Sequence, residues 1–133
     1  MAAINIIIAD DEAPARNRLR DLLADIANTK VVAEAHNGKQ AIELAAQYAP
    51  DLLLLDIRMP LMDGLEAAQH AQKLNPKPCV IFTTAYENYA IQAFDLNAID
   101  YLLKPIRLER LQTAIDKVQA LKPTQLDALK PLH

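Results

Sequence analysis

Short apolar runs alternate along this chain with longer segments in which apolar residues recur every three or four positions. The short runs are rich in Ile, Leu and Val, which favours β-strands. One of them, "LLLLD", has no polar residue before its last position, as a strand buried on both faces should. We therefore predict five strands, over residues 4–9, 31–35, 52–56, 80–84 and 98–103.

The segments between these runs have the spacing of amphipathic helices. Leu19, Leu22, Leu23 and Ile26 share one helical face, and Pro14 suits the first turn of that helix. The same periodicity and the positions of Gly and Pro predict four more helices. They are expected over residues 41–48, from 64 toward 74, over 86–94, and from 108 to the Lys122-Pro123 pair.

Regular alternation of strand and helix predicts an α/β fold with a parallel sheet and helices on both faces. Right-handed crossovers place the carboxyl ends of all strands at one edge of the sheet. Five strands and five helices fit the flavodoxin-like (βα)5 doubly wound fold, with strand order 2-1-3-4-5 and a ligand crevice between strands 1 and 3. We expect this domain over residues 1–121, and a linker or the start of a truncated effector region over residues 122–133.

Composition removes several classes of function. The net charge of −3 gives no basic stripe for nucleic acid, and only Gly38 and Gly64 occur, which excludes glycine-rich phosphate loops. No apolar run approaches the ~20 residues of a membrane span, and the N-terminus lacks a signal-peptide pattern. We therefore expect a cytoplasmic protein with no membrane partner.

Polar residues stand where four of the predicted strands end. Asp10 and Asp11 follow the first strand, Asp56 closes the third, Thr84 closes the fourth, and Lys104 follows the fifth. Carboxylates brought together at one sheet edge need a counter-charge. Mg²⁺, which prefers oxygen ligands, supplies that charge, and Lys104 adds another. The sequence therefore predicts a site for Mg²⁺ and one phosphoryl group.

With these residues in order, the sequence resembles the receiver domain of two-component response regulators over residues 4–121. The motifs that carry the resemblance are "ADDE", "LLLLDIRMPLMDG", "VIFTTAY" and "DYLLKP", each at the end of its own strand. The stretch "YAIQAFDLNAIDYLLKP" is similar to the branch (AlgR/LytR-like) whose receivers precede LytTR-type DNA-binding domains.

The resemblance implies a role for each matching residue. Asp56 would be the phosphoacceptor that attacks a phosphohistidine of a sensor histidine kinase. Asp11, Asp10 and the backbone carbonyl of Arg58 would bind Mg²⁺ together with Asp56. Lys104 would contact the phosphoryl group, and its peptide bond with the following proline would be cis.

Two further residues would carry the response. Thr84 matches the switch hydroxyl and Tyr101 the switch aromatic, so phosphorylation would draw Thr84 inward and let Tyr101 turn. The face formed by helix 4, strand 5 and helix 5 would change as a result and control a transcriptional output domain. The resemblance also implies a homodimer on phosphorylation, and contact with DNA only through a C-terminal LytTR-type domain outside this chain.

Three alternatives remain beside this interpretation. The first is a stand-alone receiver that acts by protein–protein contact. The second is an aspartate-dependent phosphohydrolase, which needs a second Asp two residues after the nucleophile, where this chain has Arg58. The third is a flavodoxin, which needs a Ser/Thr/Gly-rich loop where this chain has "DDEAPAR". We expect a phosphoacceptor with at most slow autodephosphorylation rather than an enzyme.

Several other polar and aromatic residues have simpler interpretations. Arg16 and Arg20 lie one helical turn apart and suit a solvated helix face. Asp63 before a glycine suits a helix cap. Tyr86 and Tyr89 are expected to be packing residues.

Overall fold

The computed structural model describes residues 3–129, and side chains over residues 3–121. Five parallel strands form one sheet in the order β2-β1-β3-β4-β5, which confirms the predicted fold. The strands are β1 (Ile4–Ala9), β2 (Thr29–Ala35), β3 (Leu52–Asp56), β4 (Cys79–Thr84) and β5 (Asp100–Leu103). Each begins within two residues of its predicted start and ends at the predicted residue.

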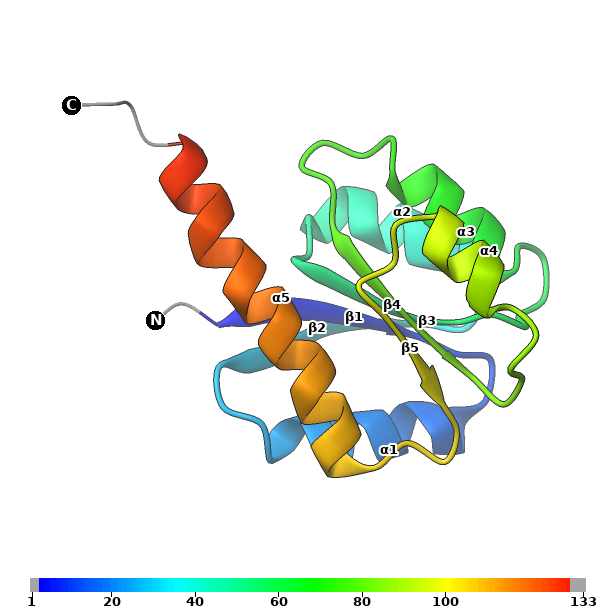
Figure 1. Cartoon of the computed structure of the whole chain (residues 1–133). Helices are drawn as coiled ribbons and strands as arrows, with labels where there is room; N and C mark the ends of the chain where they lie inside the picture. The colour runs from blue at the N-terminus through cyan, green and yellow to red at the C-terminus, as the bar shows by residue number, and fades with distance from the viewer. Residues whose placement is uncertain (1–2, 130–133) are drawn as a thin grey trace.

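Five helices cover the two faces of the sheet. They are α1 (Ala13–Ala24), α2 (Gly38–Tyr48), α3 (Gly64–Ala71), α4 (Ala90–Asp95) and α5 (Leu108–Leu129). Figure 1 shows α1 and α5 on one face and α2, α3 and α4 on the other. None of the described helices combines the length and apolar character needed to cross a bilayer.

The two faces have separate hydrophobic cores because side chains alternate along each strand. Leu52 and Leu54 of β3 pack with residues of α1 and α5, whereas Leu53 and Leu55 pack with residues of α2, α3 and α4. All four leucines are fully buried, which confirms that "LLLLD" is a strand covered on both sides. The central strand is therefore buried along its whole length, and its polar residue, Asp56, comes where the strand ends.

The structure corrects two helix boundaries. Helix α4 begins at Ala90 rather than near Tyr86, because the Tyr86 N–H donates to the Thr84 hydroxyl and its carbonyl accepts from another side chain. Helix α5 does not end at Lys122-Pro123 but continues to Leu129. A proline inside a helix removes one N–H donor, and the residues after it, "TQLDAL", contain no glycine or second proline.

Two other expectations concern the end of the chain and one peptide bond. The Lys104-Pro105 peptide is cis, as predicted. The division into residues 1–121 and 122–133 stays a prediction, since the side chains after residue 121 and the backbone after residue 129 lie outside the described residues.

Candidate functional site

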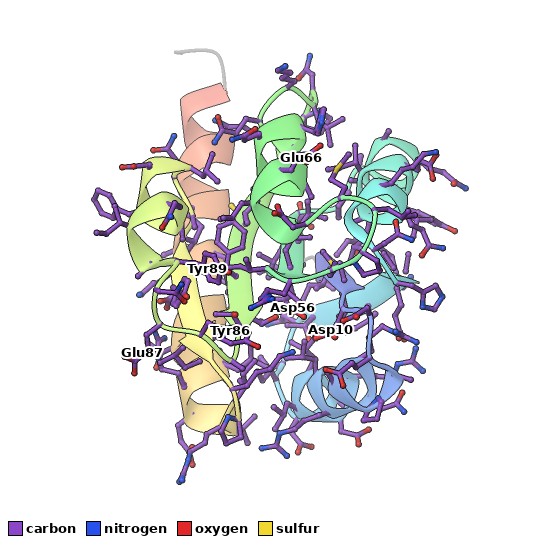
Figure 2. The ribbon with its side chains drawn as sticks, turned by 90° about the vertical axis from the view of Figure 1, so that its right-hand side faces the viewer. Asp10, Asp56, Glu66, Tyr86, Glu87 and Tyr89 are labelled. Carbon is purple, nitrogen blue, oxygen red and sulfur yellow. The ribbon has the colours of Figure 1, made fainter. Side chains whose placement is uncertain are left out.

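Three carboxylates meet at the carboxyl edge of the sheet, where β1 and β3 end. One oxygen from each of Asp10, Asp11 and Asp56 lies within 4.8 Å of the other two. Figure 2 shows the side chains of Asp10 and Asp56 beside each other beneath the loop that leads into α3. The three acids thus lie close together at the sheet edge, as the positions of the strand ends predicted.

These acids differ in exposure, and this affects their charge. Asp10 and Asp56 are buried, whereas Asp11 is exposed. Burial, and then the neighbouring charge of Asp10, raises the pKa of Asp56 from 3.8 to about 6, against the lowering effect of Lys104. A carboxylate cluster of this kind favours the binding of a cation.

Lys104 is the cation that the described structure places on this cluster. Its Nζ donates to Asp10 Oδ2 at 2.7 Å and lies 3.6 Å from Asp56 Oδ2. Burial lowers the pKa of Lys104, but the Asp10 hydrogen bond and the charge of Asp56 outweigh this effect and raise it above the usual value. Lys104 is therefore charged and reaches both buried acids from the end of β5.

The donor set suits Mg²⁺. Three carboxylates supply hard oxygen ligands, and the exposed Asp11 lines a cavity of about 550 Å³ together with Arg58. Space beside Asp11 lets a bound ion keep part of its water shell, which Mg²⁺ usually requires. The residue Arg58 thus lies at the predicted place, while the role of its carbonyl stays a prediction.

The Arg16 side chain is not solvated, so that interpretation of the sequence is wrong. It is only 11% exposed, its Nη1 donates to the Asp10 carbonyl at 2.8 Å, and its Nε lies 3.3 Å from Glu34 Oε1. Arg20 is exposed and also pairs with Glu34. The sequence pattern missed this because Glu34 belongs to β2, and helical spacing says nothing about a partner on another element.

The predicted switch residues meet at Tyr86. Thr84 is fully buried, and its Oγ1 accepts from the Tyr86 N–H at 3.2 Å. The hydroxyl of Tyr101, which is partly buried, donates to the Tyr86 carbonyl. Sequence reasoning placed Thr84 and Tyr101 in the switch but did not predict that the Tyr86 backbone joins them, because a hydrogen bond to a main-chain group leaves no sequence pattern.

The Tyr86 ring also contacts the acid site. The Arg58 guanidinium lies 4.8 Å from its ring centroid, a cation–π geometry. Tyr89 packs against the same ring edge-to-face, with ring centroids 6.3 Å apart. Figure 2 shows Tyr86 and Tyr89 beside Asp56. Tyr86 is 45% exposed, so packing is only part of its role: its ring contacts Arg58 and Tyr89, and its backbone bonds to the side chains of Thr84 and Tyr101.

Two polar residues near the site have structural roles or face away from it. The carboxylate of Asp63 accepts the Glu66 N–H at 2.8 Å, so Asp63 caps α3 as predicted. Thr83 is fully buried, and β4 alternation turns its side chain to the opposite face of the sheet from Thr84.

Comparison with known proteins gives the family. The sequence model of the response regulator receiver domain matches residues 6–116. A relative described as the positive alginate biosynthesis regulatory protein of Pseudomonas aeruginosa is 41% identical over 127 residues, which is 95% of this chain and 51% of the relative. The transcriptional regulatory protein LytR of Staphylococcus aureus is 40% identical over 87% of this chain and 47% of the relative. The chain thus spans about half the length of these relatives.

Solved structures agree with the sequence comparison. The receiver domain of AraT, a response regulator from Geobacillus stearothermophilus, superposes with a TM-score of 0.82 at 37% identity, covering 92% of this chain and 98% of that one. The response regulatory domain of mrkE from Klebsiella pneumoniae gives a TM-score of 0.84 at 29% identity, covering 91% and 99%. The predicted resemblance to receivers, and to the LytTR-type branch among them, is confirmed.

Proposed function

The chain is a receiver domain of the response regulator family, and we propose that it is a phosphorylation-dependent switch with Asp56 as the phosphoacceptor. One observation carries the assignment: the buried Asp56 carboxylate lies beside two further acids and 3.6 Å from the Lys104 ammonium. A buried carboxylate in this setting can act as a nucleophile. Its product, an acyl phosphate, adds negative charge beside Lys104 and beside the place where a metal ion would bind, so that charge can be offset.

Phosphoryl transfer at this site uses residues that are already in place. An Asp56 oxygen forms a bond to phosphorus while the bond from phosphorus to the histidine nitrogen of a sensor kinase breaks. Asp10, Asp11, Asp56 and the Arg58 carbonyl would hold Mg²⁺, which offsets the charge that the phosphoryl group brings. Lys104 then contacts a phosphoryl oxygen while keeping its hydrogen bond to Asp10.

The response starts from the Thr84 hydroxyl. Phosphoryl oxygens on Asp56 attract that hydroxyl, which at present accepts the Tyr86 N–H. A shift of Thr84 frees the Tyr86 backbone, whose carbonyl holds the Tyr101 hydroxyl. Tyr101 lies on β5 and packs against the hydrophobic cluster that includes Ala93 of α4, and the preceding Asp100 pairs with Arg110 and Lys117 of α5. The change therefore reaches the face formed by these three elements.

This face has the features of an interface between two copies of the domain. Ile91 and Phe94 on α4 are 77% and 81% exposed, an unusual exposure for two large apolar side chains on one short helix. We propose that two copies of the domain pair through this face when Asp56 is phosphorylated. Relatives that are about twice as long include a transcriptional regulatory protein, so an output domain that binds DNA is the corresponding proposal for the whole protein.

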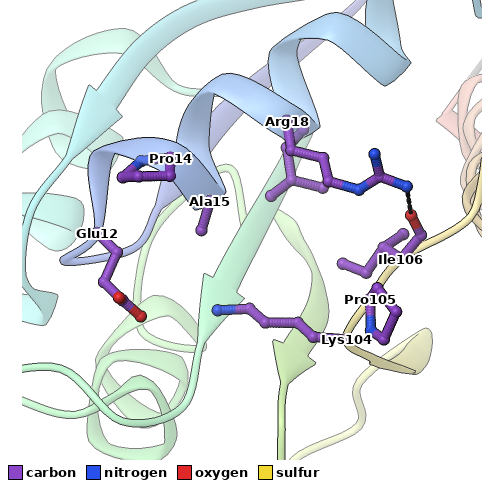
Figure 3. A pocket seen from close by; sticks show the side chains of 8 residues that line it. Glu12, Pro14, Ala15, Arg18, Lys104, Pro105 and Ile106 are labelled. Carbon is purple, nitrogen blue, oxygen red and sulfur yellow. Dashed lines mark hydrogen bonds between the residues drawn. The ribbon is translucent and has the colours of Figure 1, made fainter.

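The kinase would dock beside α1. A cavity of about 330 Å³, shown in Figure 3, lies between α1 and the loop after β5 and is lined mainly by apolar groups. Arg18 closes one side by donating to the Ile106 carbonyl at 2.7 Å, and Lys104 lies on the other. A donor histidine must come within bonding distance of Asp56, so a kinase also covers this cavity.

Phosphorylation by a small phosphodonor tests the proposal. We expect one phosphoryl group per chain with acetyl phosphate and Mg²⁺, observed by intact mass spectrometry, and none for Asp56→Asn. Asp11→Asn should weaken Mg²⁺ binding and slow labelling while the fold is kept. Asp116→Asn is the matched control, since Asp116 is an exposed acid of α5 that does not belong to the acid cluster. Labelling of Asp56→Asn at the parent rate would overturn the assignment.

A phosphomonoester assay separates the phosphohydrolase alternative. Such an enzyme would release phosphate from p-nitrophenyl phosphate with many turnovers. We expect no turnover, because Arg58 stands where the second acid of that mechanism is needed.

A further inference from the structure

We propose that Arg16 is a positioning residue for the acid pair, held in place by Glu34; this inference rests on the proposed Mg²⁺ and phosphoacceptor function. Its guanidinium donates to the Asp10 carbonyl at 2.8 Å and pairs with the Glu34 carboxylate of β2 at 3.3 Å. The Arg16 side chain therefore links the first turn of α1 to the Asp10 backbone and to strand β2.

The contacted carbonyl belongs to the peptide group between Asp10 and Asp11. A peptide group is planar, so fixing its oxygen also fixes the direction in which the chain leaves Asp10 and presents Asp11. Asp11 is exposed, and no described hydrogen bond involves its carboxylate. The orientation of this ligand therefore depends on the backbone that Arg16 holds.

Arg16 completes the hydrogen bonding of Asp10. The Asp10 N–H donates to the Ala35 carbonyl at 3.1 Å, Oδ1 accepts from the Glu12 N–H at 2.9 Å, and Oδ2 accepts from Lys104. The carbonyl is the remaining polar group, and Arg16 takes it. Only three residues separate β1 from α1, so the backbone of this turn has little room to adopt another path.

The place of Arg16 on its helix also points to a specific role. Arg16 is the fourth residue of α1, and a cation near a helix N-terminus is disfavoured by the helix dipole. Burial of a guanidinium to 11% exposure adds a desolvation cost. The Glu34 carboxylate and the Asp10 carbonyl, which both contact the guanidinium, offset these two costs.

The measurement is Mg²⁺ affinity by calorimetry, at a temperature where each variant is fully folded. Arg16→Met keeps the apolar stem and should weaken Mg²⁺ binding about tenfold, as loss of a residue that orients metal ligands typically does. Arg16→Lys should recover part of this loss, because an ammonium reaches one of the two partners. Amide resonances of Asp11 and Glu12 in the metal-free protein should broaden in Arg16→Met.

Arg20→Ala is the matched control, since Arg20 pairs with the same Glu34 but makes no described contact with Asp10. It should bind Mg²⁺ like the parent. Glu34→Gln removes the carboxylate that holds Arg16 and should lower the Mg²⁺ affinity several-fold. It serves as the test variant if Arg16→Met does not fold. Parent affinity in Arg16→Met, or in Glu34→Gln in that case, would overturn the positioning role. Absence of Mg²⁺ binding in the parent would instead overturn the proposed function beneath it.

Discussion

Asp56 is bordered by two regions that are built differently. On one side lies the acid side, which we define as the β1–α1 turn with Lys104. On the other lies the tyrosine side, which comprises residues 84–95 with Tyr101. On the acid side every polar group of Asp10 has a hydrogen bond, and α1 anchors the turn with two buried leucines over twelve residues.

The tyrosine side is held more weakly. Helix α4 has six residues and buries only one of them, Ala93. Thr84 and Tyr101 are each joined to Tyr86 by a hydrogen bond that a small rotation would break. Because the free energy of a switch must be small enough for one phosphoryl group to change it, the weakly held side is the one suited to move. The acid side is suited to bind charge without moving.

Breaking the acid side should have the largest effect. Lys104→Met leaves the fully buried Asp10 without its cation, which should lower the free energy of unfolding by about 3 kcal/mol. Lys117→Met is the control, since Lys117 is about half exposed and shares Asp100 with Arg110; it should cost at most about 1 kcal/mol. Urea unfolding in the presence of a chelator measures both. Equal losses in the two variants would mean that the acid side is not a distinct rigid unit.

The tyrosine side should be changeable without loss of stability. The double variant Ile91→Ser, Phe94→Ser should weaken the beryllofluoride-stabilised dimer at least about tenfold, yet leave the free energy of unfolding within about 0.5 kcal/mol. Sedimentation equilibrium with and without beryllofluoride measures the dimer. Leu61→Ser is the matched control, because Leu61 is 82% exposed but lies on the loop before α3. A parent-strength dimer in the double variant would place the interface elsewhere.

The pair Arg58 and Tyr86 sharpens the comparison, since Tyr86 belongs to the tyrosine side and Arg58 follows β3, the strand that carries Asp56 between the two regions. Neither side chain is a general base. The Arg58 guanidinium lies 4.8 Å from the Tyr86 ring centroid, and we expect this pair to obstruct the path of a hydrolytic water to Asp56. The variant Arg58→Ala, Tyr86→Ala should therefore release phosphate about tenfold faster, a barrier change of about 1.4 kcal/mol. Phosphate release from the labelled domain with Mg²⁺ is the measurement. Tyr48→Ala, at 46% exposure against 45% for Tyr86, should hydrolyse at the parent rate; an unchanged double variant would rule out shielding.

The fold was largely predictable because its signals are local. An apolar run such as "LLLLD" reports a doubly covered strand, and alternation of strands and helices leaves few topologies. The start of α4 was missed for a physical reason: the Tyr86 backbone bonds to side chains of Thr84 and Tyr101 instead of entering a helix. Propensity within one segment carries no information on such a partner.

The same limit applies to the site. Asp10, Asp11, Asp56 and Lys104 were predictable because strand ends of a parallel sheet share one edge. The role of Arg16 was not, since its partner Glu34 is 18 residues away on another element. Burial of Asp56, which determines its acidity, likewise depends on the packed structure and not on its neighbours in sequence.

That burial gives the last predicted effect, a pH dependence of the free energy of unfolding. Burial, with the charge of Asp10, raises the pKa of Asp56 from 3.8 to about 6, so folded Asp56 binds a proton more tightly than unfolded Asp56. Stability of the metal-free protein should therefore fall as pH rises through this window, and the penalty should be complete above about pH 6. Asp100 titrates at lower pH. Burial raises its pKa, but its hydrogen bonds to Arg110 and Lys117 outweigh burial and lower the pKa to about 2. Its contribution to the stability of the fold is therefore lost only as pH falls toward that value.

Asp56→Asn isolates this effect because it removes the titrating group. Its melting temperature should match the parent near pH 4, where both side chains are neutral in the fold, and exceed that of the parent near pH 7. Mg²⁺ should remove most of the difference at pH 7 by stabilising the parent, since the ion binds the charged cluster. Scanning calorimetry at both pH values, with and without the ion, gives the answer. The same difference at both pH values would show that the pKa of Asp56 is not raised in the fold, by burial or by the charge of Asp10.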